Sequence, residues 1–299
     1  MCGRPDPPHR TALILIPSPL PPPVAPTQPH PADDELPGRS RTGAVRGPLS
    51  GKTALVTGAS RGIGRAIAER LAADGALVAV HYARNAEAAD AVVSSIRTAG
   101  GEAFPVRTEL GVAGDTETLY AAFDSALVRR GIEPRLDVLV NNAAVSGSAR
   151  IHEVTAELYD RIFSVNVKAL LLLTREGLTR MPEGGRVINI SSAITRMSYP
   201  ESVVYSMSKG ALNTLTLALA KELGSRGITV NAVAPGFTAT DMNAKLRTTP
   251  EGVARLAGLS VFDRIGRPSD IAGAVAFLAS PDALWVTGQL LDASGGMHL

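Results

Sequence analysis

A short apolar strand that runs directly into a glycine-rich turn and a helix constrains the fold of this chain more than any other feature. The strand is KTALV at residues 52–56, and the turn TGASRGIG follows at residues 57–64 with the glycine spacing G-x-x-x-G-x-G. Residues 65–73 carry an apolar stripe at helical spacing, and a second apolar strand occupies residues 76–81. Glycines in such a turn let the backbone approach a pyrophosphate, whose charge is bound by the free amides at the helix start. The unit therefore predicts a dinucleotide site, although a glycine-rich turn can also be only a loop.

Strands and helices continue to alternate along the chain. Helices are expected near residues 86–99, 116–130, 156–180 and 203–223, and strands at residues 103–107, 136–140, 186–190 and 229–234. This order predicts an α/β fold with a single Rossmann-type, doubly wound parallel sheet that has helices on both faces. Ligands of such sheets bind beyond the carboxyl ends of the strands, and the residues expected there are Gly58, Asn141, Ser191, Ser192, Pro235 and Gly236.

Tyr205 and Lys209 lie four residues apart and so share one face of the expected helix 203–223. A phenol titrates near pH ~10 and a lysine near ~10.4, so neither alone is a good acid at pH 7. A neighbouring cation favours the phenolate and is expected to lower the pKa of Tyr205. The pair is typical of proton transfer, but a half-buried tyrosine beside a solvated lysine would have the same spacing.

These motifs together resemble the short-chain dehydrogenase/reductase family. The resemblance is carried by TGASRGIG, by NNAA at residues 141–144, by Asn166, by Ser192 and by YSMSK at residues 205–209, and it extends from about Gly51 to the C-terminus. The overall pattern is similar to that of 3-oxoacyl thioester reductases. It implies an oxidoreductase that transfers hydride reversibly between NADP(H) and a 3-oxoacyl-type or other small ketone, or its alcohol.

The resemblance assigns a role to each catalytic position. It implies that Tyr205 exchanges a proton with the substrate oxygen, while Lys209 lowers the tyrosine pKa and holds the nicotinamide ribose. Ser192 would orient the carbonyl; Ser191 is a chemical rival, but Ser192 has the thirteen-residue spacing to Tyr205. Asn166 would hold a water of the proton relay, although it could also be a polar residue on the helix surface.

The resemblance also implies contacts to the cofactor from the turn and the strand ends. The residues concerned are Gly58, Ser60, Arg61, Gly62, Ile63, Gly64, Glu109, Leu110, Asn141, Ala143, Tyr205, Lys209, Pro235, Gly236, Thr238 and Thr240. Glu109 stands where the family more often has Asp, and Asn141 could be a turn residue. Thr238 and Thr240 could equally cap the next helix.

Charge near the end of the second strand selects the dinucleotide. An NAD site needs an acid there, which would also repel a 2′-phosphate, but no acid occurs before Glu87. Arg61 and Arg84 offer bidentate partners for that phosphate. NADP(H) is therefore the expected cofactor, with a solvated loop charge as the alternative for Arg61.

Composition excludes several other classes. A net charge of only +2 with no dense basic stripe gives no support for nucleic-acid binding. The single cysteine, Cys2, and five histidines without ligand spacing predict no metal site and suit a reducing cytoplasm. Since no apolar run approaches roughly 18 residues, no membrane span is expected.

The first 50 residues differ from the rest because they hold 13 of the 21 prolines and no Phe, Tyr or Trp. We expect residues 1–50 to be a disordered Pro-rich extension and residues 51–299 to be one dinucleotide-binding and catalytic domain.

Substrate and assembly are less constrained. Glu183 counts against docking of an acidic carrier protein, while Arg196 and Arg226 leave it open. The expected specificity segments 146–150, 194–199 and 237–246 contain no decisive residue. A sugar or steroid alcohol dehydrogenase, an isomerase or dehydratase, and an NADPH-binding regulator or scaffold without turnover are the alternatives. The resemblance suggests a homotetramer, in which the apolar stretch 284–291 could pack on a neighbour.

Overall fold

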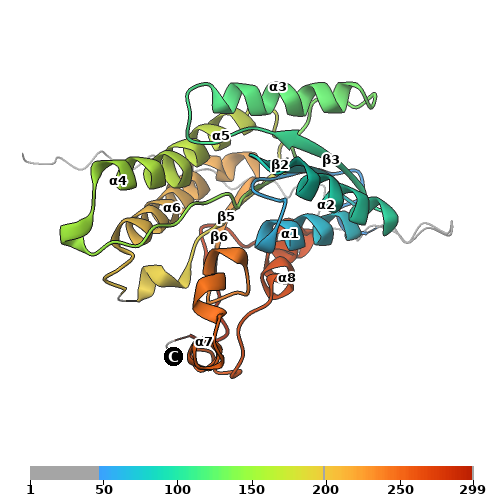
Figure 1. Ribbon diagram of the computed structural model, residues 1–299. Coiled ribbons are helices and arrows are strands. Elements are labelled where there is room, and N and C mark those ends of the chain that lie inside the picture. The colour runs from blue at the N-terminus through green and yellow to red at the C-terminus, as the bar shows by residue number, and fades with distance from the viewer. Residues whose placement is uncertain (1–46, 198, 298–299) are drawn as a thin grey trace, which may run out of the picture. The chain divides into compact units, whose positions relative to one another are not determined.

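A seven-stranded parallel sheet forms the centre of the folded unit (Figure 1). The computed structural model describes residues 47–197 and 199–297. The strands are β1 (Thr53–Val56), β2 (Leu77–Tyr82), β3 (Glu102–Arg107), β4 (Val138–Asn141), β5 (Arg186–Ile190), β6 (Thr229–Pro235) and β7 (Leu290–Ala293). Their spatial order is β3-β2-β1-β4-β5-β6-β7, and every neighbouring pair is parallel. The order reverses between β1 and β4, so the predicted doubly wound Rossmann-type sheet is confirmed.

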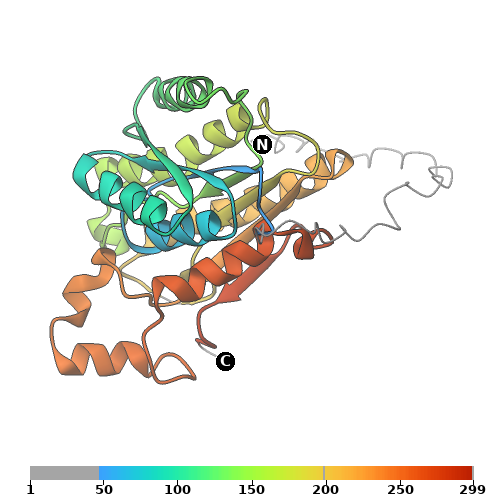
Figure 2. The ribbon, with the colours of Figure 1, turned by 90° about the vertical axis from the view of Figure 1, so that its right-hand side faces the viewer.

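Helices cover both faces of this sheet (Figure 2). They are α1 (Gly62–Ala73), α2 (Ala86–Thr98), α3 (Asp115–Val128), α4 (Ala156–Phe163), α5 (Leu170–Gly177), α6 (Val203–Leu223), α7 (Pro250–Ala257) and α8 (Pro268–Ala279). Residues of α1, α2 and α8 pack with Ala54 and Val56 in one buried cluster, and residues of α3, α5 and α6 pack with Leu55 in another. Alternate residues of β1 thus enter opposite layers, which explains why this strand is apolar throughout.

The helix expected at residues 156–180 is broken by a π-helical turn. The turn spans Ser164–Ala169 between α4 and α5, and α5 ends at Gly177. Such π-helical turns occur mostly as single turns inside α-helices, and the apolar pattern of residues 156–180 did not distinguish this one. Helix α8 and strand β7 were not predicted from the sequence. Of the apolar stretch 284–291, only the last two residues lie in β7.

The folded unit begins earlier than the predicted boundary at residue 51. The expected extension lies outside the described residues up to position 46, but its last four residues form a turn. Leu49 is 2% exposed within the first core cluster, and its N–H donates to the carbonyl oxygen of Asp74 at 2.8 Å. Residues 47–50 therefore belong to the folded domain, because the apolar side chain of Leu49 packs in the first core cluster. In the described part of the chain, no helix is long and apolar enough to cross a membrane.

Candidate active site

The glycine-rich turn connects β1 to α1 and depends on the absence of side chains. Gly58 and Gly62 have φ angles of +64° and +55°, a region that favours glycine. A Cβ at Gly64 would lie 2.3 Å from the carbonyl oxygen of Gly58, which is too close for any other residue. The turn is therefore as compact as the sequence pattern predicted. Ser60 and Ile63 lie in the same turn and are half-buried.

Three polar residues that the predicted site omitted hold this turn. Asn142 Nδ2 donates to the carbonyl oxygens of Thr57 and Gly58 at 2.8 and 3.1 Å, and Thr57 Oγ1 accepts from the N–H of Asn142 at 2.9 Å. The N–H of Gly58 donates to His81 Nδ1 at 3.0 Å, while His81 Nε2 lies 2.9 Å from the carbonyl oxygen of Thr108. Burial lowers the pKa of His81 to about 4, so the ring is neutral at pH 7 with its proton on Nε2. The sequence signal that could have identified His81 is the presence of a histidine inside an otherwise apolar strand.

The start of α1 is free to bind an anion. Arg61 occupies the N-cap position without a side-chain capping bond, and the first turn contains no acidic residue. The first amides of a helix have no intrahelical acceptor and lie at the positive end of its dipole. A diphosphate therefore fits this turn, in which glycines allow close approach and uncapped amides supply donors.

Both arginines expected near a 2′-phosphate are paired with carboxylates. Arg61 Nη1 lies 3.1 Å from Asp241 Oδ2, and both side chains are largely exposed. Arg84, just beyond the end of β2, forms an ion pair with Glu109. Leu110 follows Glu109 and is buried in the second core cluster, so its side chain contributes to the core.

Burial shifts the pKa values of the catalytic pair in opposite directions. Lys209 on α6 is 2% exposed, its Nζ donates to the carbonyl oxygen of Ile190 at 2.7 Å, and burial lowers its pKa to about 8. Burial raises the pKa of Tyr205 to about 12, and a hydrogen bond with the Ser192 hydroxyl only partly offsets this. Lys209 Nζ lies 5.8 Å from the centroid of the Tyr205 ring. Desolvation of the phenolate is thus the largest cause of the tyrosine shift, and a lowering of the Tyr205 pKa by Lys209 stays a prediction.

The two neighbouring serines face different partners. Ser192 follows β5 and is half-buried; its Oγ accepts from the N–H of Ile194 at 3.2 Å, and its hydroxyl lowers the pKa of Tyr205. Ser191 is buried, and its Oγ donates to Asn213 Oδ1 at 2.6 Å. Only Ser192 thus shares an oxygen-binding position with the phenol, in keeping with the choice made from spacing.

Asn166 lies in the π-helical turn and is fully buried. Its Oδ1 accepts from the N–H of Val145 at 2.9 Å, and its Nδ2 donates to the carbonyl oxygen of Val145 at 2.9 Å and to Ser208 Oγ at 3.1 Å. Ser208 Oγ in turn donates to the carbonyl oxygen of Tyr205 at 2.7 Å. Both amide hydrogens are used, so the side chain joins the turn to α6, and a role of Asn166 in holding a relay water stays a prediction. Ser208 is a further residue that the predicted site omitted.

Asn141 ties the sheet together at the end of β4. Its Nδ2 donates to Thr174 Oγ1 at 3.0 Å and to Asn189 Oδ1 at 2.9 Å. Its own Oδ1 is buried and has no hydrogen-bond partner among the residues described. The side chain thus supports the sheet, while contact with the cofactor ribose stays a prediction. Ala143 lies beside the turn, its Cα only 3.0 Å from a Cβ built at Gly58.

The segment after β6 is held by its own hydrogen bonds. Pro235 ends β6, and a Cβ at Gly236 would lie 2.7 Å from the carbonyl oxygen of Ser294. Thr238 Oγ1 donates to the carbonyl oxygen of Gly236 at 3.2 Å. Thr240 precedes the 3-10 turn Asp241–Arg247, and its N–H donates to Asn243 Oδ1 at 3.3 Å. Contact of Thr238 and Thr240 with the cofactor stays a prediction.

The parallel sheet brings the predicted residues to one edge. Strand register pairs Val56 with Val140, Asn141 with Asn189, and Ile190 with Val233. The segments that follow β1, β4, β5 and β6 therefore leave the sheet at the same edge. These segments contain the glycine turn, Asn142, Ser192 and Gly236.

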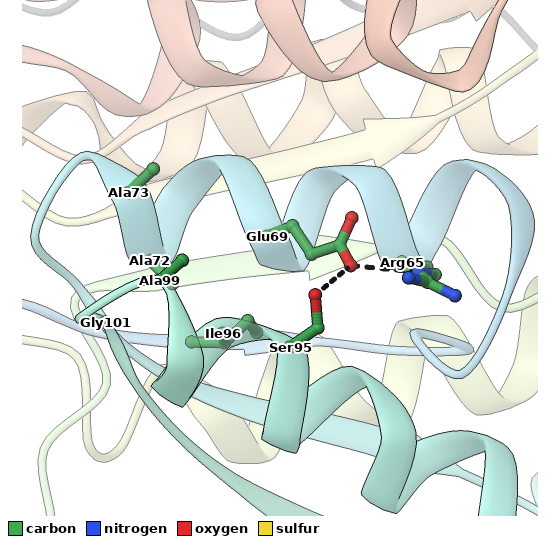
Figure 3. Close-up of a pocket in the computed structure, with 8 residues that line it drawn as sticks. All are labelled: Arg65, Glu69, Ala72, Ala73, Ser95, Ile96, Ala99 and Gly101. Carbon is green, nitrogen blue, oxygen red and sulfur yellow. Dashed lines mark hydrogen bonds and ion pairs between the residues drawn. The ribbon is translucent and has the colours of Figure 1, made fainter.

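A cavity of about 270 Å³ lies elsewhere, between α1 and α2 (Figure 3). Its polar groups satisfy one another, since Glu69 Oε1 accepts from Arg65 Nε at 2.9 Å and from Ser95 Oγ at 3.2 Å. Its other lining residues are small or apolar, and none belongs to the predicted site. We therefore place the chemistry at the sheet edge and not in this cavity.

Comparisons with known proteins agree on the class of enzyme that this chain resembles. A family model described as enoyl-(acyl carrier protein) reductase matches residues 58–298. A short chain dehydrogenase/reductase of Aspergillus novofumigatus is 40% identical over 261 residues, which cover 84% of this chain and 97% of the relative.

Two solved structures are also similar. LugOII, a promiscuous reductase that catalyses keto-reduction at C1 during lugdunomycin biosynthesis, is 53% identical with a TM-score of 0.81, covering 84% of this chain and 99% of its own. The landomycin C-6 ketoreductase LanV, solved with bound NADP and rabelomycin, is 51% identical with a TM-score of 0.77, covering 83% of this chain and 97% of its own.

Proposed function

This chain belongs to the short-chain dehydrogenase/reductase family of oxidoreductases, and from this premise we propose that it is an NADP(H)-dependent ketoreductase acting on a free small-molecule ketone. The reaction would be reversible, with a secondary alcohol as the reduced form. Bound NADPH would supply the hydride.

The Ser192 hydroxyl that lowers the pKa of Tyr205, together with Lys209 buried one helical turn further along α6, carries this proposal. With a pKa of about 12, Tyr205 is fully protonated at pH 7 and can donate its proton to a ketone oxygen. The Ser192 hydroxyl can bind the same oxygen. Lys209, with a pKa of about 8, is mostly charged at pH 7 and would stabilise the phenolate that proton transfer leaves.

Charge supports NADP(H) over NAD(H). The diphosphate would bind at the glycine turn and the start of α1, whose amides are uncapped. Arg61 and Arg84 are the cations available for a 2′-phosphate, which could replace their exposed partners Asp241 and Glu109. The bound NADP of LanV agrees with this choice.

Two arginines that left carrier-protein docking open are engaged within the chain. Arg226 Nη2 donates to the carbonyl oxygens of Met181 and Leu178, and Arg196 forms an ion pair with Asp292 at 2.6 Å. A free ketone is therefore favoured over a ketone presented by an acidic carrier protein.

The decisive experiment replaces the proton donor. We expect Tyr205→Phe to abolish NADPH oxidation with a panel of ketones while NADPH affinity, measured by fluorescence titration, changes little. Tyr159→Phe on α4, where the side chain is 40% exposed, is the matched control and should keep full activity. Equal loss of turnover and cofactor binding in Tyr205→Phe would show a structural tyrosine. A wild-type protein that binds NADPH but turns over none of the ketones would favour a regulator or scaffold.

A further inference from the structure

Two aromatic residues from separate loops meet beside the catalytic groups. The rings of Tyr199 and Phe237 are T-shaped, with centroids 6.2 Å apart and an interplanar angle of 68°. Tyr199 lies in the loop between β5 and α6, and Phe237 follows β6. Both side chains are half-buried, so each ring keeps an exposed part after the pair has formed.

Strand register brings these loops to the reactive hydroxyls. Ile190 pairs with Val233, so Ser192 and Pro235 leave the sheet at the same level on adjacent strands. Phe237 is two residues beyond Pro235, and the Tyr199 loop starts at Ser192 and ends at the helix that carries Tyr205. The aromatic pair therefore spans the two loops that border the Ser192–Tyr205 hydrogen bond.

Backbone hydrogen bonds hold the two loops that carry these rings. On one side, the N–H of Ala149 donates to the carbonyl oxygen of Glu201 at 2.9 Å, which anchors the Tyr199 loop. On the other side, the N–H of Gly266 donates to the carbonyl oxygen of Phe237 at 2.9 Å. A surface held in this way can orient a substrate without first being ordered by it.

The cations around this surface are already engaged. Arg196 pairs with Asp292, Arg150 pairs with Glu201, and Arg247 donates to the carbonyl oxygen of Thr240. A phosphorylated or carboxylated substrate would have to displace one of these partners. A neutral substrate would not, so the charges favour an uncharged ligand.

Building on the proposed ketoreductase function, we propose that Tyr199 and Phe237 form an aromatic wall that selects neutral ketones fused to an aromatic ring. Ring quadrupoles favour edge-to-face or offset contacts, in which an aromatic substrate gains more than a saturated one of equal size. The wall would orient such a ketone with its carbonyl at Ser192 and Tyr205. Tyr199 and Phe237 are thus specificity-determining residues.

The test compares two ketones that differ in the ring and hardly in size, 2-tetralone and trans-2-decalone. For the wild-type enzyme with NADPH, we expect kcat/KM to be higher for 2-tetralone. Tyr199→Leu and Phe237→Leu keep apolar bulk but remove a ring, and each should lower the tetralone-to-decalone ratio by roughly two- to tenfold. Tyr199→Phe keeps the ring and should keep the ratio. Tyr159→Leu, at an aromatic pair on α4, is the matched control and should leave the ratio unchanged.

The outcomes separate this inference from the function on which it rests. An unchanged ratio in both leucine variants, each checked for wild-type Tm and NADPH affinity, would overturn the aromatic wall. Wild-type turnover of both ketones without preference for 2-tetralone would also overturn the aromatic wall, but it would leave the ketoreductase proposal standing. Failure to oxidise NADPH with either ketone, or with any ketone of the wider panel, would overturn both.

Discussion

At the scale of single residues, burial decides how the catalytic groups titrate. Tyr205 and Lys209 share a helix face, and burial is the largest cause of both shifts: it raises the pKa of Tyr205 to about 12 and lowers the pKa of Lys209 to about 8. A tyrosine that stays protonated at pH 7 suits the proton donor of a reductase. A lysine with a pKa of about 8 is expected to limit activity at alkaline pH.

The pH dependence of cofactor capture should report that limit. Because the pKa of Lys209 is lowered to about 8, its ammonium is present below this pH and is lost above it. We expect kcat/KM for NADPH, which reflects the free enzyme, to fall as pH rises through about 8. Tyr205, with a pKa of about 12, should cause no further change in kcat/KM between pH 6 and 10. A profile that stays flat to pH 10 would contradict this assignment.

The ion pair of Arg61 and Asp241 should compete with the cofactor phosphate. Asp241→Asn frees Arg61, and since exposed pairs contribute about 0.2–1 kcal/mol, NADPH affinity should rise by at most about fivefold. NADH lacks the 2′-phosphate and should bind as in the wild type. In an Arg61→Ala background the same substitution should have no effect. A similar gain for NADH and NADPH, measured by titration, would show that Asp241 does not act through Arg61.

At the scale of elements, the β1–α1 turn is set by contacts that only glycine permits. A Cβ at Gly64 would lie 2.3 Å from the Gly58 carbonyl oxygen and 2.5 Å from Asn142 Nδ2, whereas Gly273 in α8 has no neighbour within 4 Å among the described residues. We expect Gly64→Ala to cost about 1–3 kcal/mol of unfolding free energy and to weaken NADPH binding. Gly273→Ala should be neutral or stabilise by up to about 1 kcal/mol. Urea unfolding measures the unfolding free energy of both variants. Equal values for Gly64→Ala and Gly273→Ala would contradict a turn that only glycine fits.

The π-helical turn between α4 and α5 is the second element with a local function. It places Asn166 where its side chain joins the loop at Val145 to Ser208 of α6. A regular helix would carry this amide elsewhere on its circumference. Such turns are uncommon and often lie at functional sites, which agrees with the position of this one.

At the scale of the whole molecule, an exposed apolar surface points to assembly. Trp285, the single tryptophan, is 99% exposed, and Leu284 beside it is 61% exposed. A Cβ built at Gly288 of the same loop would lie 4.0 Å from Leu217 of α6, which is itself 60% exposed. Large apolar side chains that gather on a surface mark interaction sites. We propose that this surface is covered in a homotetramer, as the family resemblance suggests.

Tryptophan emission and mass test this assembly. Light scattering should give a tetramer, and dilution should move the Trp285 emission to longer wavelength as the indole meets water. Trp285→Glu should lower the measured mass, while Val128→Glu on α3, where the side chain is 60% exposed, should not. A monomer at every concentration would contradict the proposal.

The sequence by itself determined the α/β alternation and the glycine turn and predicted the catalytic positions, because these depend on local periodicity and on residues at fixed short spacings. Strand β5 and helix α6 occur at the residues predicted, 186–190 and 203–223. Tertiary structure alone decided which polar groups meet across the sheet, as when His81 binds Gly58, and how far burial shifts each pKa. It also placed Tyr199 against Phe237, which lie in two of the expected specificity segments, 194–199 and 237–246, where the sequence showed no decisive residue. Such contacts join residues far apart in the chain, and only the packing of strands and helices fixes the distances between them.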